Sequence, residues 1–155
     1  MKSKVDEVLE CFNSGFSCSQ AVLSTYCEQF GLDKQSALKL SCAFGAGMGR
    51  LGETCGAVTG AYLLIGLKCG QCEVEDRAAK EETFRLVREF ANEFTKRNDS
   101  TICRELLGVD LLNGDKQLAG QRVKAVCPGV VKDAAEIIEK ILGMDQSDPL
   151  DQENN

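Results

Sequence analysis

The sequence predicts an all-α fold: a single compact domain of six to eight helices. Apolar residues recur at three- and four-residue intervals along most of the chain, as they do on one face of a helix. Strand signals are weak, because aromatic residues make up only 6% and no segment alternates apolar and polar side chains for long. A chain of 155 residues is long enough to bury about 70% of its unfolded surface in one core.

The first half of the chain predicts four helices. Segment 3–13 carries an apolar face, and segment 17–30 carries another, with Ser17 as the N-cap and Gly31 as the stop. A short helix over 34–44 follows Asp33, and a buried helix runs from 53 to about 68. Between these two, the glycine-rich stretch from Gly45 to Gly52 cannot be regular helix throughout, so we expect a tight turn between closely packed helices.

The second half predicts a long amphipathic helix over 75–97 and a short helix between Ser100 and Gly108. Two more are expected over 115–126 and 128–142, because Pro128 suits the first turn of a helix. The domain is therefore expected to span residues 1–143. Residues 144–155 are acidic and poor in apolar side chains, and we expect a disordered tail there.

Composition excludes several classes of function. The chain has no histidine, which rules out Ser-His-Asp and Cys-His catalysis, histidine-ligated zinc and a proximal-histidine haem from this chain alone. The net charge is −6, so the basic surface that nucleic-acid binding needs is missing. No acid–base pair stands out as catalytic, so the sequence does not decide whether the protein is an enzyme.

The sequence also suggests a compartment. The N-terminus MKSKVDEVLECF is too charged for a secretory signal, and the most apolar stretch, 57–67, is shorter than the roughly 20 residues that span a bilayer. We therefore expect a cytoplasmic protein that is not membrane-embedded. In a reducing cytosol, nine cysteines indicate ligands, redox thiols or core residues rather than structural disulfides.

The cysteines fall into groups according to the helices. Cys27 and Cys42 share apolar faces with Leu23 and Leu38, which predicts buried core residues, and Cys11 lies beside its helix's apolar face. Four others fall at or within one turn of an expected helix start, where the helix dipole favours a thiolate. They are Cys18, Cys55, Cys103 and Cys127.

The remaining pair, Cys69 and Cys72, has the two-residue spacing of a redox pair or of half a metal site. It follows the end of an expected helix, where the dipole opposes thiolate formation. A solvent-exposed turn with incidental thiols explains the spacing equally well. The pair is kept as an accessory redox candidate.

Several motifs together resemble one known family. They are CGAVTG at 55–60, CSQAV at 18–22, FGAGMG at 44–49, and the later Cys103 and Cys127. Over about residues 8–142 this pattern resembles the C_GCAxxG_C_C family of redox-active proteins, whose four cysteines match Cys18, Cys55, Cys103 and Cys127. Cys69 and Cys72 look like additions to the family pattern.

The resemblance implies a redox role that rests on the cysteines. A similar module occurs in split-Soret-type cytochromes, where four cysteines are associated with an iron–sulfur cluster. This chain has neither histidine nor a CxxCH sequence, so haem chemistry does not carry over.

Three classes of function follow. In the first, the four cysteines converge from separate helices to hold an iron–sulfur cluster, and the protein transfers electrons. Helix starts would offset part of the thiolate charge, and basic side chains could offset more: Arg50, Arg104, Arg122 and Lys124. In the second, the same thiols form a metal-free dithiol/disulfide centre that passes electrons through Cys69 and Cys72.

Structural zinc is a further option, which the absence of compact paired spacing disfavours. In the third class, the protein is a non-catalytic helical binding protein with incidental cysteines. Gly56 and Gly60 would let a second helix approach closely near Cys55 and bring another cysteine within reach. The sequence leaves open the redox partner protein and the oligomeric state, a homo-oligomer included.

Overall fold

The computed structural model describes residues 2–144, and among these the chain forms helices and no strand. The all-α prediction is confirmed. The helices are α1 (Val5–Asn13), α2 (Cys18–Tyr26), the 3-10 helix η1 (Cys27–Phe30), α3 (Lys34–Cys42), α4 (Gly45–Met48), α5 (Gly56–Cys69), α6 (Arg77–Asn98), α7 (Cys103–Leu107) and α8 (Lys116–Ile141). No helix in this part of the chain is long and apolar enough to cross a membrane.

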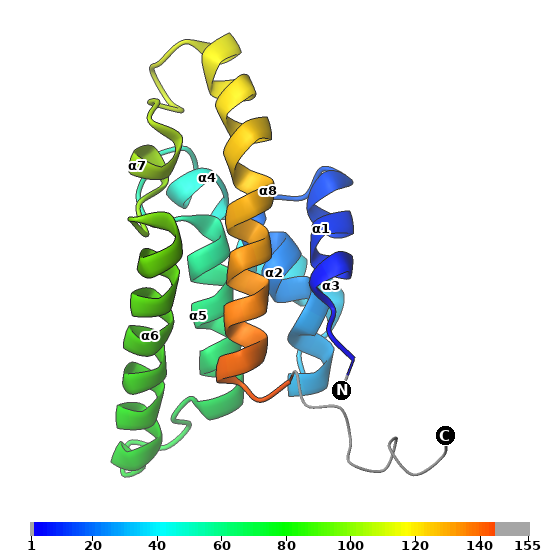
Figure 1. Ribbon diagram of the computed structural model, residues 1–155. Helices are drawn as coiled ribbons and strands as arrows, with labels where there is room; N and C mark the ends of the chain where they lie inside the picture. The colour runs from blue at the N-terminus through cyan, green and yellow to red at the C-terminus, as the bar shows by residue number, and fades with distance from the viewer. Residues whose placement is uncertain (1, 145–155) are drawn as a thin grey trace, which may run out of the picture.

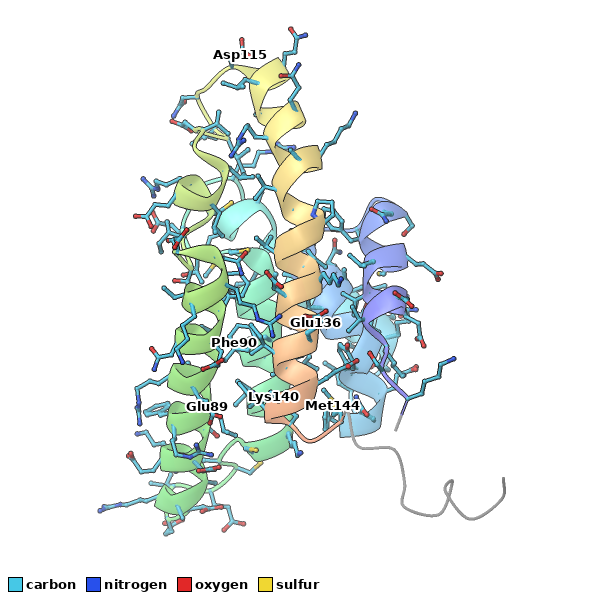
Figure 2. All side chains as sticks on the ribbon, in the orientation of Figure 1. Glu89, Phe90, Asp115, Glu136, Lys140 and Met144 are labelled. Carbon is cyan, nitrogen blue, oxygen red and sulfur yellow. The ribbon has the colours of Figure 1, made fainter. Side chains whose placement is uncertain are left out.

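Helix α5 is the centre of the bundle, and α2, α6 and α8 all pack against it (Figure 1). It buries eight of its fourteen residues because it carries almost no polar side chain. Phe90 and Phe94 of α6 stack on each other, and Phe90 also meets the edge of Tyr62 on α5. Figure 2 labels Phe90 between α6 and the rest of the bundle.

The expected capping residues start their helices. Ser17 accepts a hydrogen bond from the Gln20 amide, and the Gln20 side chain accepts one from the Ser17 amide, which completes a capping box. Asp33 caps α3 with a single bond: its carboxylate accepts from the Ser36 amide. Gly31 ends η1 in the left-handed conformation, with φ of 82°.

Helix α8 corrects one prediction. Residues 116–141 form one continuous helix with Pro128 inside it, where two helices were expected. An internal proline costs about 3 kcal/mol because it removes a backbone hydrogen bond. Packing outweighs this cost on both sides of the proline: Val131 belongs to the main core, and Val126 packs against Cys103 and Leu107. In Figure 2 the helix runs the length of the molecule, from Asp115 to Lys140.

The glycine-rich turn departs from regular helix, as expected, and its backbone is left-handed. Five successive residues from Ala46 to Arg50 have φ between 56° and 72°. Non-glycine residues adopt this conformation at a cost of roughly 1–2 kcal/mol each, so Ala46, Met48 and Arg50 are strained. Such strain persists only where the surrounding structure enforces it.

Two further predictions concern single segments. Cys42 is exposed, where a buried position was expected, because α3 buries Ala37 and Ser41 instead. Cys27 is fully buried, as expected. Of the predicted tail 144–155, only Met144 lies within the described residues; its side chain is 5% exposed and packs against the main core.

Candidate functional site

Four cysteines from four elements line a single cavity of about 310 Å³. They are Cys18, Cys55, Cys103 and Cys127, the same four that the sequence analysis separated from the others. Most of the remaining wall is apolar, with Phe12, Phe16, Leu106, Leu107 and Val126 among its side chains. Its lining residues include Ala46 and Gly47 of α4, Cys55 and Gly56 at the start of α5, and Cys103 at the start of α7. Figure 1 shows α4 and α7 near this end of α5.

Cys18 reaches this cavity because α2 and α5 approach each other closely. A Cβ at Gly60 would lie 3.0 Å from the carbonyl oxygen of Ser19, and one at Gly56 would lie 3.3 Å from the Cβ of Cys18. Larger side chains at either glycine would push the two helices apart. The predicted role of Gly56 and Gly60 is thus confirmed: a second helix packs against them, and it carries a cysteine.

Cys55 and Cys103 are positioned by a short antiparallel ladder. The Cys55 amide donates to the carbonyl of Thr101 (2.8 Å), and the Cys103 amide donates to the carbonyl of Glu53 (2.7 Å). Thr54 and Ile102 form the bridge between these two bonds. The two cysteines are therefore diagonal neighbours on one face of the ladder, a relation that separates Cα atoms by about 7–8 Å.

The Arg104 side chain stabilises this ladder, a role that the sequence did not predict. Its side chain donates to the carbonyls of Leu51 and Gly52 and forms an ion pair with Glu53. Arg122 similarly donates to the carbonyl of Leu107. These two arginines were considered as counter-charges for thiolates, but the structure places their guanidinium groups on backbone carbonyls instead.

The left-handed turn packs closely against the segments that carry Cys18 and Cys103. A Cβ at Gly47 would lie 2.6 Å from the Cβ of Cys103 and 2.8 Å from the backbone nitrogen of Glu53. A Cβ at Gly45 would lie 2.7 Å from the Cβ of Ser17, next to Cys18. The glycine-rich stretch therefore forms one wall of the cavity and allows the backbone to touch two of the cysteine-bearing segments.

Cys127 enters the cavity from the middle of α8, so the expectation that it starts a helix is wrong. The other three placements hold: Cys18 and Cys103 are the first residues of α2 and α7, and Cys55 is the N-cap of α5. Cys18 also packs against the apolar cluster that Cys103, Leu107 and Cys127 form.

Burial outweighs the helix dipole in setting the protonation of these thiols. It raises the pKa of Cys55 from 9.0 to about 12, although the amides of Ala57 and Val58 oppose the change, and it raises the pKa of Cys103 to about 11. Hydrogen bonding with Cys127, followed by burial and repulsion from the other cavity cysteines, holds the pKa of Cys18 well above its usual range. Hydrogen bonding with Cys18 lowers the pKa of Cys127. The expected thiolates at helix starts are therefore neutral thiols in the cofactor-free protein.

These shifts predict a loss of stability at high pH. The folded protein keeps the protons of Cys55 and Cys103 at pH values where the unfolded chain has released them, so their contribution is complete below about pH 8.5 and falls above it. Between pH 9 and 11, each of the two thiols should lower the free energy of unfolding by about 1.4 kcal/mol per pH unit. Urea unfolding of the reduced, cofactor-free protein at pH 8, 9 and 10 measures this slope. Cys55→Ser should show a shallower slope, and an unchanged slope would contradict the assignment.

Cys69 and Cys72 lie at the opposite end of α5 from the cavity. Cys69 is the last residue of α5, and Cys72 is exposed in the connection to α6. Figure 1 shows this connection at the end of α5 away from α4 and α7. Because Cys55 immediately precedes this fourteen-residue helix, about 21 Å separates the two ends. Direct disulfide exchange between Cys69 or Cys72 and the cavity thiols of the same chain is therefore excluded by distance.

In residues 2–144, no three His, Cys, Asp or Glu side chains converge closely enough to hold one metal ion. The cavity cysteines are thus distributed around its wall rather than gathered at one point.

Comparison with known proteins agrees with the pattern of cysteines. No curated protein and no solved structure matches the chain. A family model described as "Putative redox-active protein (C_GCAxxG_C_C)" matches residues 16–141, which include all four cavity cysteines and the glycine-rich turn. The chain therefore belongs to the C_GCAxxG_C_C family of redox-active proteins.

Proposed function

We propose that the protein is an electron-transfer module that holds an iron–sulfur cluster through Cys18, Cys55, Cys103 and Cys127. The observation that supports this most strongly is that four cysteines, from four separate elements, line one cavity. Four cysteine thiolates are the usual ligand set of both [2Fe–2S] and [4Fe–4S] clusters.

The cavity is of a suitable size for such a group. Its 310 Å³ would hold about ten water molecules at roughly 30 Å³ each, which leaves room for the eight atoms of a [4Fe–4S] core. A single zinc ion needs four sulfurs about 3.8 Å from one another, given Zn–S bonds of about 2.3 Å. The diagonal placement of Cys55 and Cys103 suits a cluster better, because a cluster binds its thiolates at separate iron atoms.

The chain's own residues would supply the protein's share of the chemistry. When bound, such a cluster accepts and donates single electrons. The apolar side chains of the wall would limit the contact of the cluster with water, and the backbone bonds between 53–55 and 101–103 would hold two of the ligands near each other. Cys18, Cys55 and Cys103 must lose their protons to bind the cluster, because a thiolate is the ligand. Cluster binding should therefore release protons, and its affinity should increase as the pH rises.

A metal-free thiol/disulfide protein is the second candidate, and one observation favours it. Cys18 packs against the apolar cluster that contains Cys103 and Cys127, which brings thiols from separate helices into one place, as a disulfide requires. The raised pKa values of Cys18, Cys55 and Cys103 work against it, because the thiolate is the nucleophile in disulfide exchange.

Anaerobic reconstitution with ferrous iron and sulfide tests the proposal. After desalting, the protein should retain iron and acid-labile sulfide in equal amounts, about two to four of each per chain, with broad visible absorbance that bleaches on reduction. Retention of no iron, with a thiol count that changes by two between the oxidised and reduced protein, would instead support the thiol/disulfide candidate. Neither iron nor a change in thiols would contradict both.

A further inference from the structure

We infer that the cavity of the cofactor-free protein binds one uncharged aromatic molecule the size of naphthalene. The space concerned is the cavity of about 310 Å³ that Cys18, Cys55, Cys103 and Cys127 line. Protein interiors are close-packed and leave few voids larger than a water molecule, so an apolar space of this size is typical of a ligand-binding pocket. Binding there needs no cluster, and a cluster would exclude the aromatic molecule because both would fill the same space.

The chemistry of the wall selects an uncharged ligand. Among the described residues, nine apolar side chains, four cysteines and three glycines line the cavity, and no charged side chain does. Ser17 is the one other residue of the wall, and its hydroxyl is already bonded to the amide and the side chain of Gln20. A charged or strongly polar ligand would lose its hydration without gaining a side-chain partner in return, which disfavours its burial.

The thiols of the wall support the same choice. Burial raises the pKa of Cys55 to about 12 and that of Cys103 to about 11, so both are uncharged near neutral pH. An uncharged buried cysteine behaves as a small apolar side chain. The pKa of Cys127 is lowered instead, and its thiolate would favour a cation. A cationic probe is therefore the natural comparison for an uncharged one.

The size of the cavity and its two phenylalanines select an aromatic ligand. Phe12 and Phe16 both line the cavity, and aromatic rings attract one another in edge-to-face and offset arrangements. An engineered apolar cavity of about 150 Å³ in another protein binds benzene. The 310 Å³ here is about twice that volume, which suits two fused rings better than one.

Phe16 marks the entrance to the cavity. It lies in the connection between α1 and α2, and its side chain is 39% exposed although it also lines the cavity. Gly15, next to it, lines the cavity too, and a Cβ there would meet no atom of the described residues within 4 Å. A ligand can therefore enter beside Phe16 without the opening of a helix.

Titration with naphthalene tests the site. The reduced protein is purified anaerobically with a chelator, without iron or sulfide, and naphthalene binding is measured by equilibrium dialysis. We expect saturable binding of one naphthalene per chain. Quinolizinium, a cation of the same shape, should bind at least about tenfold more weakly, because burial of its charge is disfavoured in this wall. No saturable binding of naphthalene, or equal binding of the cation, would overturn the inference.

Two exposed phenylalanines place the binding in this cavity. Phe16→Ala removes part of the wall and should weaken naphthalene binding about threefold to tenfold, which is the contribution of one aromatic pair. Phe84→Ala is the matched control, because Phe84 is 47% exposed on α6 and does not line the cavity. This variant should bind naphthalene as tightly as the wild type. Equal affinities of the two variants would show that naphthalene binds elsewhere.

A larger side chain in the cavity should compete with the ligand. Val123 of α8 lines the cavity, so Val123→Phe should weaken binding at least about tenfold by occupying part of the space. Leu118→Phe introduces the same side chain on the same helix at a residue that is 46% exposed and outside the cavity, and it should leave binding unchanged. Unchanged binding by a folded Val123→Phe would overturn the site, and if this variant does not fold, the two phenylalanine variants decide.

Naphthalene binding and cluster loading fail separately, because the dialysis contains neither iron nor sulfide. A protein that retains iron after reconstitution but does not bind naphthalene would overturn the aromatic site alone. A protein that binds naphthalene but retains no iron would contradict the proposed function and support the aromatic site.

Discussion

Replacing Cys55 with serine should abolish cofactor loading. The Cys55 thiol is 4% exposed, lines the cavity and is held by the bond from its amide to Thr101, so no other side chain can take its place. A serine hydroxyl is a poor ligand for iron, which prefers thiolates in clusters. We expect the iron retained after reconstitution to fall by more than about tenfold, since even the loss of a group that only supports a ligand costs about 10–100-fold in metal affinity.

Cys27→Ser is the matched control for this experiment. Cys27 is also a buried cysteine, but it lies in η1, where its thiol donates to the carbonyl of Ser24 away from the cavity. A serine can make the same bond, so the variant should load as much iron as the wild type. Equal loading by Cys55→Ser and Cys27→Ser would contradict the assignment of the site.

Gly47→Ala should be strongly destabilising and should also impair loading. Alanine at φ of 66° costs roughly 1–2 kcal/mol. Its Cβ would also lie 2.6 Å from the Cβ of Cys103, and overpacking of this kind costs about 1–3 kcal/mol more. We expect the free energy of unfolding in urea to fall by about 2–5 kcal/mol in total.

Gly49→Ala separates the two causes. Gly49 has φ of 67°, almost the same as Gly47, but a Cβ there would meet no atom within 4 Å. This variant should therefore lose only the conformational part, about 1–2 kcal/mol, and should load iron normally. If both alanines cost the same, the close approach of the glycine-rich turn to Cys103 contributes nothing to the fold.

The all-α fold and its caps could be predicted from the sequence because they depend on local patterns. Ser17 and Asp33 cap helices through bonds that span three residues, and the apolar periodicity of each segment lies within that segment. The continuity of α8 could not be predicted in this way. It depends on packing of Val126 and Val131 against distant elements, which outweighs the local preference of Pro128.

The same distinction applies to the site. Cys18, Cys55 and Cys103 could be singled out from their positions at helix starts and Cys127 from family resemblance, but the protonation of these thiols could not be predicted. The helix-start argument considered the dipole alone, whereas burial of Cys55 and Cys103 is a tertiary property and has the larger effect. The role of Arg104 in holding the backbone of Leu51 and Gly52 could not be predicted, since these hydrogen bonds join residues more than fifty positions apart in the sequence.

The order in which the chain leaves the ribosome has a consequence for maturation. Cys18 is synthesised early, whereas Cys127 is synthesised only with the middle of α8. Helix α8 must pack along the bundle before its side of the cavity is in place. The pocket is therefore complete only after α8 has docked along the bundle, so any cofactor that the four cysteines hold would bind after this step.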